Sequence, residues 1–370
     1  MIQPRVFLVM NDDQPLSPWY FEPLTLEDIL AAGILIVFGV FFICLYSIVA
    51  YVMLKCDKEI VGFRFLFSAS IADILLLFNY TIWPGLTILF KSEIIPRWSR
   101  HWVQFYLDWV WFSMCLHYIA IAWSRFAAIK YSLRFRIQSR TFSYSLCACC
   151  YVGALIQVLC THFTPWYTVF YFDPEFYGML SENFPKYLNE GQSLFFACFH
   201  FLMILIPAAF YGVALFLLLR HRKNGILAKK QTPKRVKSSS KQARAEARLI
   251  IPCILNSIVF LIGQVAITLG TGEGKWATWT VLVLFAINSA VNPILLLMFS
   301  AIIREKVLQF FRTVPQKPKH HKSSNDQHNV THSTILVVNK QAANLNTYFE
   351  EEEIKIFITE DLSTEFSTYL

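Results

Sequence analysis

The chain has 370 residues, of which 55% are hydrophobic, 16% are aromatic and only 16% are charged. This composition excludes an ordinary soluble domain and favours a protein embedded in a membrane. The formal net charge of +8 gathers in the loops on one side of the expected membrane spans. It therefore indicates topology and attraction to anionic membrane lipids, and no nucleic-acid partner is expected.

Seven apolar runs are long enough to cross a bilayer, for which a helix needs about 20 residues. Their continuous hydrophobicity is typical of helices and differs from the alternating pattern of membrane β-barrels. The runs cover residues 29–54, 63–90, 102–124, 142–163, 192–219, 249–270 and 276–299. The sequence thus predicts an all-α membrane protein with a seven-helix bundle, preceded by a short segment at residues 1–28.

Lys and Arg residues predict how the bundle is oriented. Nineteen of them lie in the loops on one side, not counting the tail, and six lie on the other side. Because loops rich in Lys and Arg stay in the cytoplasm, the N-terminus is predicted to lie outside and the C-terminus inside.

The second and third spans each contain a carboxylate. A charge in mid-membrane costs at least ~2.5 kcal/mol, so Asp73 is expected to face the protein interior, either as a functional group or as a structural hydrogen bond between helices. Asp108 precedes Trp111 in the outer half of the third span. It is placed either to receive a ligand in an aromatic enclosure or to reach water from an interfacial aromatic belt.

The seventh span contains two amides and a proline in Asn288-Ser289-Ala290-Val291-Asn292-Pro293. Asn288 and Asn292 are four residues apart and share one helix face, where lipid would leave their amides unpaired. Pro293 removes a backbone donor and favours a kink. The segment is either a packing feature of a kinked helix or a hinge between two states.

The third span ends in residues 124–136, SRFAAIKYSLRFR. This string resembles the DRYxAIxxPLRYR stretch of rhodopsin-like G-protein-coupled receptors. Asp73 then falls on their second-helix sodium-site aspartate, and residues 288–293 on their seventh-helix NSxxNPxxY. The resemblance covers about residues 30–312 and is strongest to nematode serpentine chemoreceptors of the class X type, with their apolar, Phe-rich spans.

Several residues depart from the family pattern. Ser124 replaces the acid before Arg125, Ser132 replaces a loop proline, and Leu296 replaces the tyrosine after Asn-Pro. The usual extracellular cysteine of the third helix would fall near Arg100, so the family disulfide is absent. Ala286 stands where an opsin lysine would bind retinal, and no cofactor is expected.

The resemblance implies a chemosensory receptor in the plasma membrane that binds a small molecule and activates a heterotrimeric G protein. By depth in the helices, the ligand is expected near Asp108, Trp111, Phe199, His200 and Gln264. Asp73, Asn288 and Asn292 would form the central polar site. Arg125 would pair with Glu246 in the resting state and release it on activation, while Pro293 serves the hinge.

The chain after the seventh span is expected to form an amphipathic eighth helix that ends by residue 312 and lies on inner-leaflet lipid. Residues 313–370 lack a sustained apolar face and are predicted to be a disordered cytoplasmic tail. Their hydroxyl groups make arrestin and receptor kinases further expected partners.

Other classes of function are less favoured. A transporter or channel would use Asp73 in an ion path, but the spans show no inverted repeat. An enzyme would need a nucleophile–base or metal motif, and neither GxSxG nor HExxH occurs. His117 and His200 are lone imidazoles, for which hydrogen bonding in the core is a better interpretation than metal binding.

Overall fold

The computed structural model describes residues 17–92, 94–228, 249–269 and 274–311. The chain divides into two units, Met1–Arg312 and Thr313–Leu370. The second unit lies outside the described residues, so the disordered tail stays a prediction.

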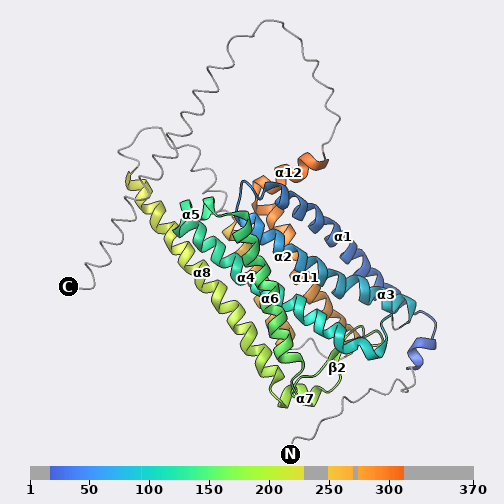
Figure 1. Cartoon of the computed structure of the whole chain (residues 1–370). Helices are drawn as coiled ribbons and strands as arrows, with labels where there is room; N and C mark the ends of the chain where they lie inside the picture. Colours follow the sequence, from blue (N-terminus) through green and yellow to red (C-terminus); the bar gives the residue numbers. More distant parts are fainter. Residues whose placement is uncertain (1–16, 93, 229–248, 270–273, 312–370) are drawn as a thin grey trace, which may run out of the picture. The chain divides into compact units, whose positions relative to one another are not determined.

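The described part of the first unit is a bundle of long helices (Figure 1). Six helical segments are long and apolar enough to cross a membrane, and a shorter apolar stretch, Ile250–Gly263, adds a seventh. These segments correspond to the seven predicted spans and confirm the all-α fold class. They are formed by α1 (Leu26–Cys56), α2 (Gly62–Leu77) with its continuation to Phe90, α4 (Arg100–Lys130), α6 (Arg140–His162), α8 (Gln192–Ala228), α10 (Ile250–Leu269) and α11 (Lys275–Phe299).

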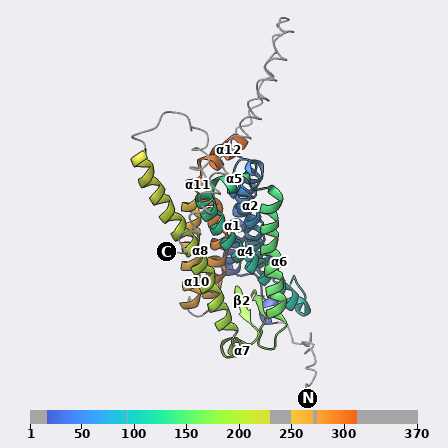
Figure 2. The ribbon, with the colours of Figure 1, turned by 60° about the vertical axis from the view of Figure 1, so that its left-hand side comes forward.

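Short elements occupy the two ends of the bundle. The helices α5 (Ser132–Ile137) and α12 (Ala301–Phe311) lie at one end, and α7 (Phe184–Asn189) lies at the other (Figures 1 and 2). Two 3-10 turns, η1 (Pro18–Phe21) and η3 (Arg97–Ser99), complete the described helices. The helix α12 follows α11 directly, as expected of the eighth helix. Its contact with lipid and the outward N-terminus stay predictions.

The second span contains a π-helical turn that the hydrophobic pattern does not reveal. This turn, η2 (Phe78–Ile82), separates α2 from α3 (Trp83–Phe90). Pro84 is the second residue of α3 and has no N–H to donate to the preceding turn, which favours a wider turn there. The turn places Tyr80 in the core, stacked on Phe285 with ring centroids 5.1 Å apart.

A β-hairpin between α6 and α8 was not predicted. Its strands, β1 (Phe170–Asp173) and β2 (Gly178–Ser181), pair antiparallel with Phe170 opposite Ser181. In the turn, Asp173 Oδ1 accepts a hydrogen bond from the N–H of Glu175 at 2.9 Å. The Asp-Pro and Tyr-Gly pairs in residues 173–178 are turn signals that would have located it.

The hairpin is tied to the start of α1. Thr25 and Asp28 form a reciprocal capping box at this helix start. Asp28 also accepts a hydrogen bond from Tyr177 Oη at 2.5 Å and lies 3.3 Å from Lys91 Nζ. Tyr177 is fully buried, and the hairpin is thereby fastened to the helices.

The helix α4 lies at the centre of the packing, against α2, α6 and α8. One buried apolar cluster includes Trp111, Phe112 and the hairpin residue Phe172. A second includes Phe63, Phe135 and Ile303, at the end occupied by α5 and α12. Residues from all the long helices are therefore held by two continuous cores.

Gly39 tests how closely α1 packs on the π-helical turn. A methyl group at this position would lie 2.8 Å from Thr81 Cβ, which forces the helices apart, whereas one at Gly33 of the same helix meets nothing described within 4 Å. Because overpacking costs about 1–3 kcal/mol, we expect Gly39→Ala to lower the melting temperature of the purified protein. Equal melting temperatures for Gly39→Ala and the control Gly33→Ala would contradict this packing.

Candidate functional site

A buried carboxyl group joins three helices near the middle of the bundle. Asp73 of α2 is fully buried. Its Oδ2 accepts hydrogen bonds from Tyr46 Oη of α1 at 2.5 Å and from Asn292 Nδ2 of α11 at 2.9 Å. The predicted proximity of Asp73 and Asn292 is thus present in the structure, and Tyr46 is an additional member.

Several buried polar atoms of α2 and α11 lack a well-formed hydrogen bond to the described part of the chain. They are Asp73 Oδ1, Ser289 Oγ and both amide atoms of Asn288, although Asn288 lies within reach of the Tyr118 hydroxyl. An unmade hydrogen bond at a buried polar atom costs about 1–3 kcal/mol. The central site therefore contains hydrogen-bond donors and acceptors that are not paired with described residues in this arrangement of the helices.

Pro293 directly follows the Asn292 contact and lies inside α11, which continues to Phe299. A proline inside a helix leaves one backbone carbonyl of the preceding turn without its donor. The proline and Asn292 are adjacent, so a change in the bend of α11 would also move the amide bonded to Asp73.

Arg125 lies toward the α5 end of α4 and is fully buried. Its Nη2 donates to the carbonyl oxygen of Gly62, the first residue of α2, at 3.1 Å. The neighbouring Ser124 donates its hydroxyl to Ile121 of its own helix at 2.7 Å. Glu246 lies outside the described residues, and its pairing with Arg125 stays a prediction.

Three of the residues predicted to contact a ligand lie together in an aromatic group. The rings of Trp111 and His200 are 6.0 Å apart, as are those of Phe199 and His200. Phe260 of α10 lies 6.2 Å from His200 and 6.1 Å from Trp111. The buried Nε2 of His200 has no hydrogen-bond partner in the described chain. This group combines a large apolar surface with one polar atom able to donate or accept.

The other two residues predicted to contact a ligand are Gln264 and Asp108. The side chain of Gln264 lies outside what is described. Asp108 is buried, and its carboxyl accepts hydrogen bonds from Gln104 Nε2 at 2.7 Å and from Tyr167 Oη at 2.5 Å. Tyr167 lies in the segment between α6 and the hairpin, so Asp108 connects α4 to this segment. Burial and the adjacent carboxyl both raise the pKa of Tyr167, which keeps its hydroxyl a donor.

The sequence lacks the family disulfide, and all nine cysteines are free. Among the described contacts that connect α4 with the segment between α6 and α7, two involve polar or charged groups of α4 and aromatic rings of that segment. One is the Asp108–Tyr167 hydrogen bond, and the other is Arg100, whose guanidinium lies 4.0 Å from the ring centre of Tyr171. Arg100 occupies about the position of the cysteine in the family pattern. A cation–π contact therefore connects the two segments in place of the disulfide bond.

The hairpin packs closely against the helices α3 and α4. A hollow between the hairpin and the helices α3 and α4 has a volume of only about 30 Å³, which is room for about one water molecule. Trp83, Arg100, Phe170, Phe172 and Met179 are among the residues that line it.

Known proteins resemble this chain in sequence and in fold. A sequence model of the serpentine type 7TM GPCR chemoreceptor Srx matches residues 36–300, which is most of the chain. The chain belongs to the Srx family of serpentine chemoreceptors. Squid rhodopsin has a similar fold, with a TM-score of 0.62 and 18% sequence identity over 80% of this chain and 89% of that chain. A comparison with curated protein sequences gives no match.

Family membership establishes the general class of function. An Srx protein is a G-protein-coupled receptor with several membrane-spanning helices, so the present chain is a multi-pass membrane receptor. This result confirms the resemblance deduced from the motifs at Asp73, Arg125 and Asn292. The family is one of receptors, which argues against a transporter, a channel or an enzyme.

Some contacts of the site had no signal in the sequence. Tyr46 lies in a span without Asp, Glu, Lys, Arg or His, and nothing in its spacing points to Asp73. Tyr167 lies outside the predicted spans, where contact with Asp108 depends on the path of the loop. Both contacts depend on tertiary geometry, and neither follows from helix periodicity.

Tyr167→Phe tests the bond between Asp108 and the segment before the hairpin. The change leaves the ring and removes the hydroxyl from a buried carboxyl group, which costs about 1–3 kcal/mol. We expect the variant in detergent to have a lower melting temperature, measured by a fluorescence signal that does not depend on labelling of the free cysteines. Tyr51→Phe is the control, because Tyr51 is an exposed tyrosine of α1. A melting temperature of Tyr167→Phe equal to that of this control would exclude a stabilising role for the contact.

Proposed function

We propose that this Srx receptor acts in the plasma membrane, where it binds a small-molecule ligand and activates a heterotrimeric G protein. The main support is the carboxyl group of Asp73, which joins α1, α2 and α11 through Tyr46 and Asn292. A ligand drives a receptor only if it binds one arrangement of the helices better than another. A shared polar contact at the centre of the bundle is where such arrangements can differ.

The unused polar atoms of Asn288 and Ser289 support a hinge at this place. A rotation or a change of bend in α11 would bring these atoms to new partners while changing the bond between Asn292 and Asp73. The gain of hydrogen bonds offsets the loss, so two arrangements can differ by only a few kcal/mol. Pro293 makes α11 easier to bend at this point than a fully hydrogen-bonded helix.

The proposed ligand position is the aromatic group around Trp111, Phe199 and His200. Its rings belong to α4, α8 and α10, so a ligand held there contacts helices that also reach the opposite end of the bundle. A predominantly apolar molecule with a single hydrogen-bonding group fits this chemistry. Asp108 serves this site indirectly, by fixing the loop through Tyr167, and Gln264 remains a predicted contact.

Arg125 is the proposed link to the G protein. It is buried at the expected cytoplasmic end of α4, against the first turn of α2. An arginine held there can change partners when helices move, and its planar group suits carbonyl or carboxylate acceptors. The proposed resting partner is Glu246. Arrestin and receptor kinases acting on residues 313–370, and inner-leaflet lipid at α12, are further proposed partners.

The coupling role of Arg125 can be tested in cell membranes. We expect Arg125→Ala to reduce activation of the G protein at least about tenfold, because a contact made only in the active state would be lost, and about 1.4 kcal/mol gives this factor. Nucleotide exchange is measured without ligand and with a panel of small molecules, at matched surface expression. Lys58→Ala, which changes an exposed cation near α2, is the control. Equal activation by the native chain and Arg125→Ala would contradict the proposal.

His200→Phe tests the polar contact at the proposed ligand position. This change keeps an aromatic ring and removes the nitrogen without a partner. For an agonist with one hydrogen-bonding group, we expect the concentration for half-maximal response to rise about threefold to tenfold, as for the loss of one hydrogen bond. Cys198→Ala is the control, since Cys198 is an exposed residue of the same helix. An unchanged dose–response curve would place the ligand elsewhere.

A further inference from the structure

The segment between α4 and α6, residues 131–139, is held at its C-terminal end by charged side chains from the α1–α2 loop and from the beginning of α2. We call this segment the α4–α6 loop. It contains the six-residue helix α5. Phe135 is buried in the second apolar cluster, whereas Tyr131 is 46% and Ile137 is 70% exposed. Phe135 therefore anchors the loop in the core, and the described exposed surface of the loop includes an aromatic and an aliphatic side chain.

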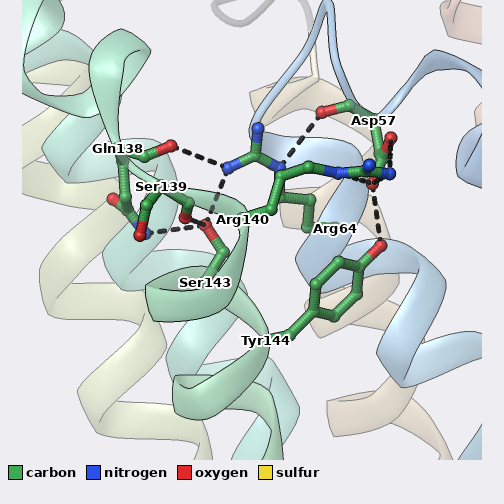
Figure 3. Close-up of polar contacts among 7 residues, drawn as sticks. All are labelled: Asp57, Arg64, Gln138, Ser139, Arg140, Ser143 and Tyr144. Carbon is green, nitrogen blue, oxygen red and sulfur yellow. Dashed lines mark hydrogen bonds and ion pairs between the residues drawn. The ribbon is translucent and has the colours of Figure 1, made fainter.

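A helix of six residues is too short to hold its shape alone, so the direction of α5 depends on contacts around it. Arg64 of α2 is 4% exposed, and its guanidinium makes three hydrogen bonds, one of them to the loop itself. Its Nε donates to the carbonyl oxygen of Asp57 at 3.1 Å. Its Nη1 donates to the carbonyl oxygen of Gln138 at 2.9 Å and to Ser143 Oγ at 3.0 Å (Figure 3). One guanidinium group thus joins the α1–α2 loop to the end of the α4–α6 loop and to α6.

Asp57 makes a second connection between the same parts of the chain. Its side chain is buried and lies against Arg140, the first residue of α6. Arg140 donates from Nε at 3.0 Å and from Nη2 at 2.6 Å, and Tyr144 Oη donates at 3.0 Å (Figure 3). A carboxylate held by two guanidinium nitrogens and a phenol has little freedom to turn.

The two connections act on one short stretch of the chain. Arg64 fixes the backbone at Gln138, and Asp57 fixes Arg140 two residues later. Ser139, between them, caps α6 by accepting from the N–H of Phe142 at 3.1 Å. On the side of α4, Ser124 donates its hydroxyl within its own helix. Arg64 and Asp57 therefore supply charged contacts at the C-terminal end of the loop.

We propose that Asp57 and Arg64 are positioning residues for coupling, which hold the α4–α6 loop in the conformation that a G protein contacts. This inference rests on the proposed function, in that it assumes a G protein as the partner. A surface that is already ordered loses less conformational entropy when a partner binds. Because both residues contact α6 or the loop and not the partner, they set the affinity by preorganisation.

A double-mutant cycle on purified full-length receptor in lipid nanodiscs tests the holding role without any ligand or G protein. Asp57→Asn and Arg140→Gln each remove one charge of the pair with little change in size. We expect hydrogen–deuterium exchange of the amides in residues 131–139 to become roughly fivefold faster in each single variant, as for the loss of one net hydrogen bond. The double variant is expected to equal either single variant, since the two side chains act as a pair.

Glu59→Gln is the matched control, because Glu59 is an exposed carboxylate two residues from Asp57. It should leave exchange in residues 131–139 unchanged. If Asp57→Asn also leaves this exchange unchanged, or if the two single effects add in the double variant, the proposed positioning by this pair is wrong. Asp57→Glu retains the carboxylate and should restore slow exchange, which a general loss of folding would not allow.

A second measurement asks whether the held loop matters for coupling. Nucleotide exchange on a purified heterotrimer is followed as a function of heterotrimer concentration, with the same nanodiscs and no added ligand. We expect the half-saturating concentration to rise roughly fivefold for Asp57→Asn, with the maximal rate little changed. An unchanged concentration, together with faster amide exchange, would overturn the role in coupling. A native chain that drives no nucleotide exchange on any heterotrimer, either without ligand or with the panel of small molecules, would overturn the proposed function, and amide exchange would still decide whether Asp57 positions the loop.

Discussion

The carboxyl group of Asp73 is the constraint to which much of the bundle is fitted. In a bilayer no solvent water is available to this group, so its hydrogen bonds have to come from the protein interior. Tyr46 and Asn292 provide them from helices at opposite ends of the sequence. The result is a polar contact among α1, α2 and α11 inside otherwise apolar packing. Apolar packing alone is weakly directional, whereas these hydrogen bonds specify which helix faces meet.

The same principle recurs toward each end of the bundle. Asp108 binds Tyr167 near the hairpin, and Asp57 binds Arg140 near α5. Each carboxyl group connects a long helix or its loop to a segment that would otherwise have few constraints. Together with Arg64 and Arg125, which bind backbone carbonyls, these groups connect loops whose sequences differ from the family pattern. The chain thus retains a receptor fold without a disulfide and with Ser124 in place of an acid.

The sequence was informative wherever the physical signal is periodic or lies in a motif. Long apolar runs located the spans, and the four-residue spacing of Asn288 and Asn292 predicted a shared helix face. Asn288 is buried, and the partly buried Asn292 bonds to Asp73. The contact of Asn292 with Asp73 followed from matching three motifs to one family. Helix ends differed by a few residues, because polar side chains such as Arg100 and Arg140 begin helices that apolar counting starts later.

What the sequence could not provide depends on geometry between distant segments. Tyr46 has no local feature that marks it as the partner of Asp73, and the choice of Tyr167 for Asp108 depends on the path of a loop. The π-helical turn before Pro84 changes which side chains face inward by part of a turn, an effect that a uniform helical period does not include. For the ligand position, depth in the helices suggested Trp111, Phe199 and His200, while Asp108 proved to be occupied by other side chains.

The hairpin has a consequence for the kinetics of sensing. Phe172 and Tyr177 are buried among the helices, and Asp28, Lys91 and Tyr177 fasten the turn to α1. A molecule arriving from water at this end has to displace packed aromatic groups and a polar cluster, which makes that route slow. If the ligand binds at the proposed aromatic group, the alternative route leads from the bilayer between helices. For an apolar stimulus that takes this route, the response of the cell would follow the partition coefficient of the stimulus as well as its fit to the receptor.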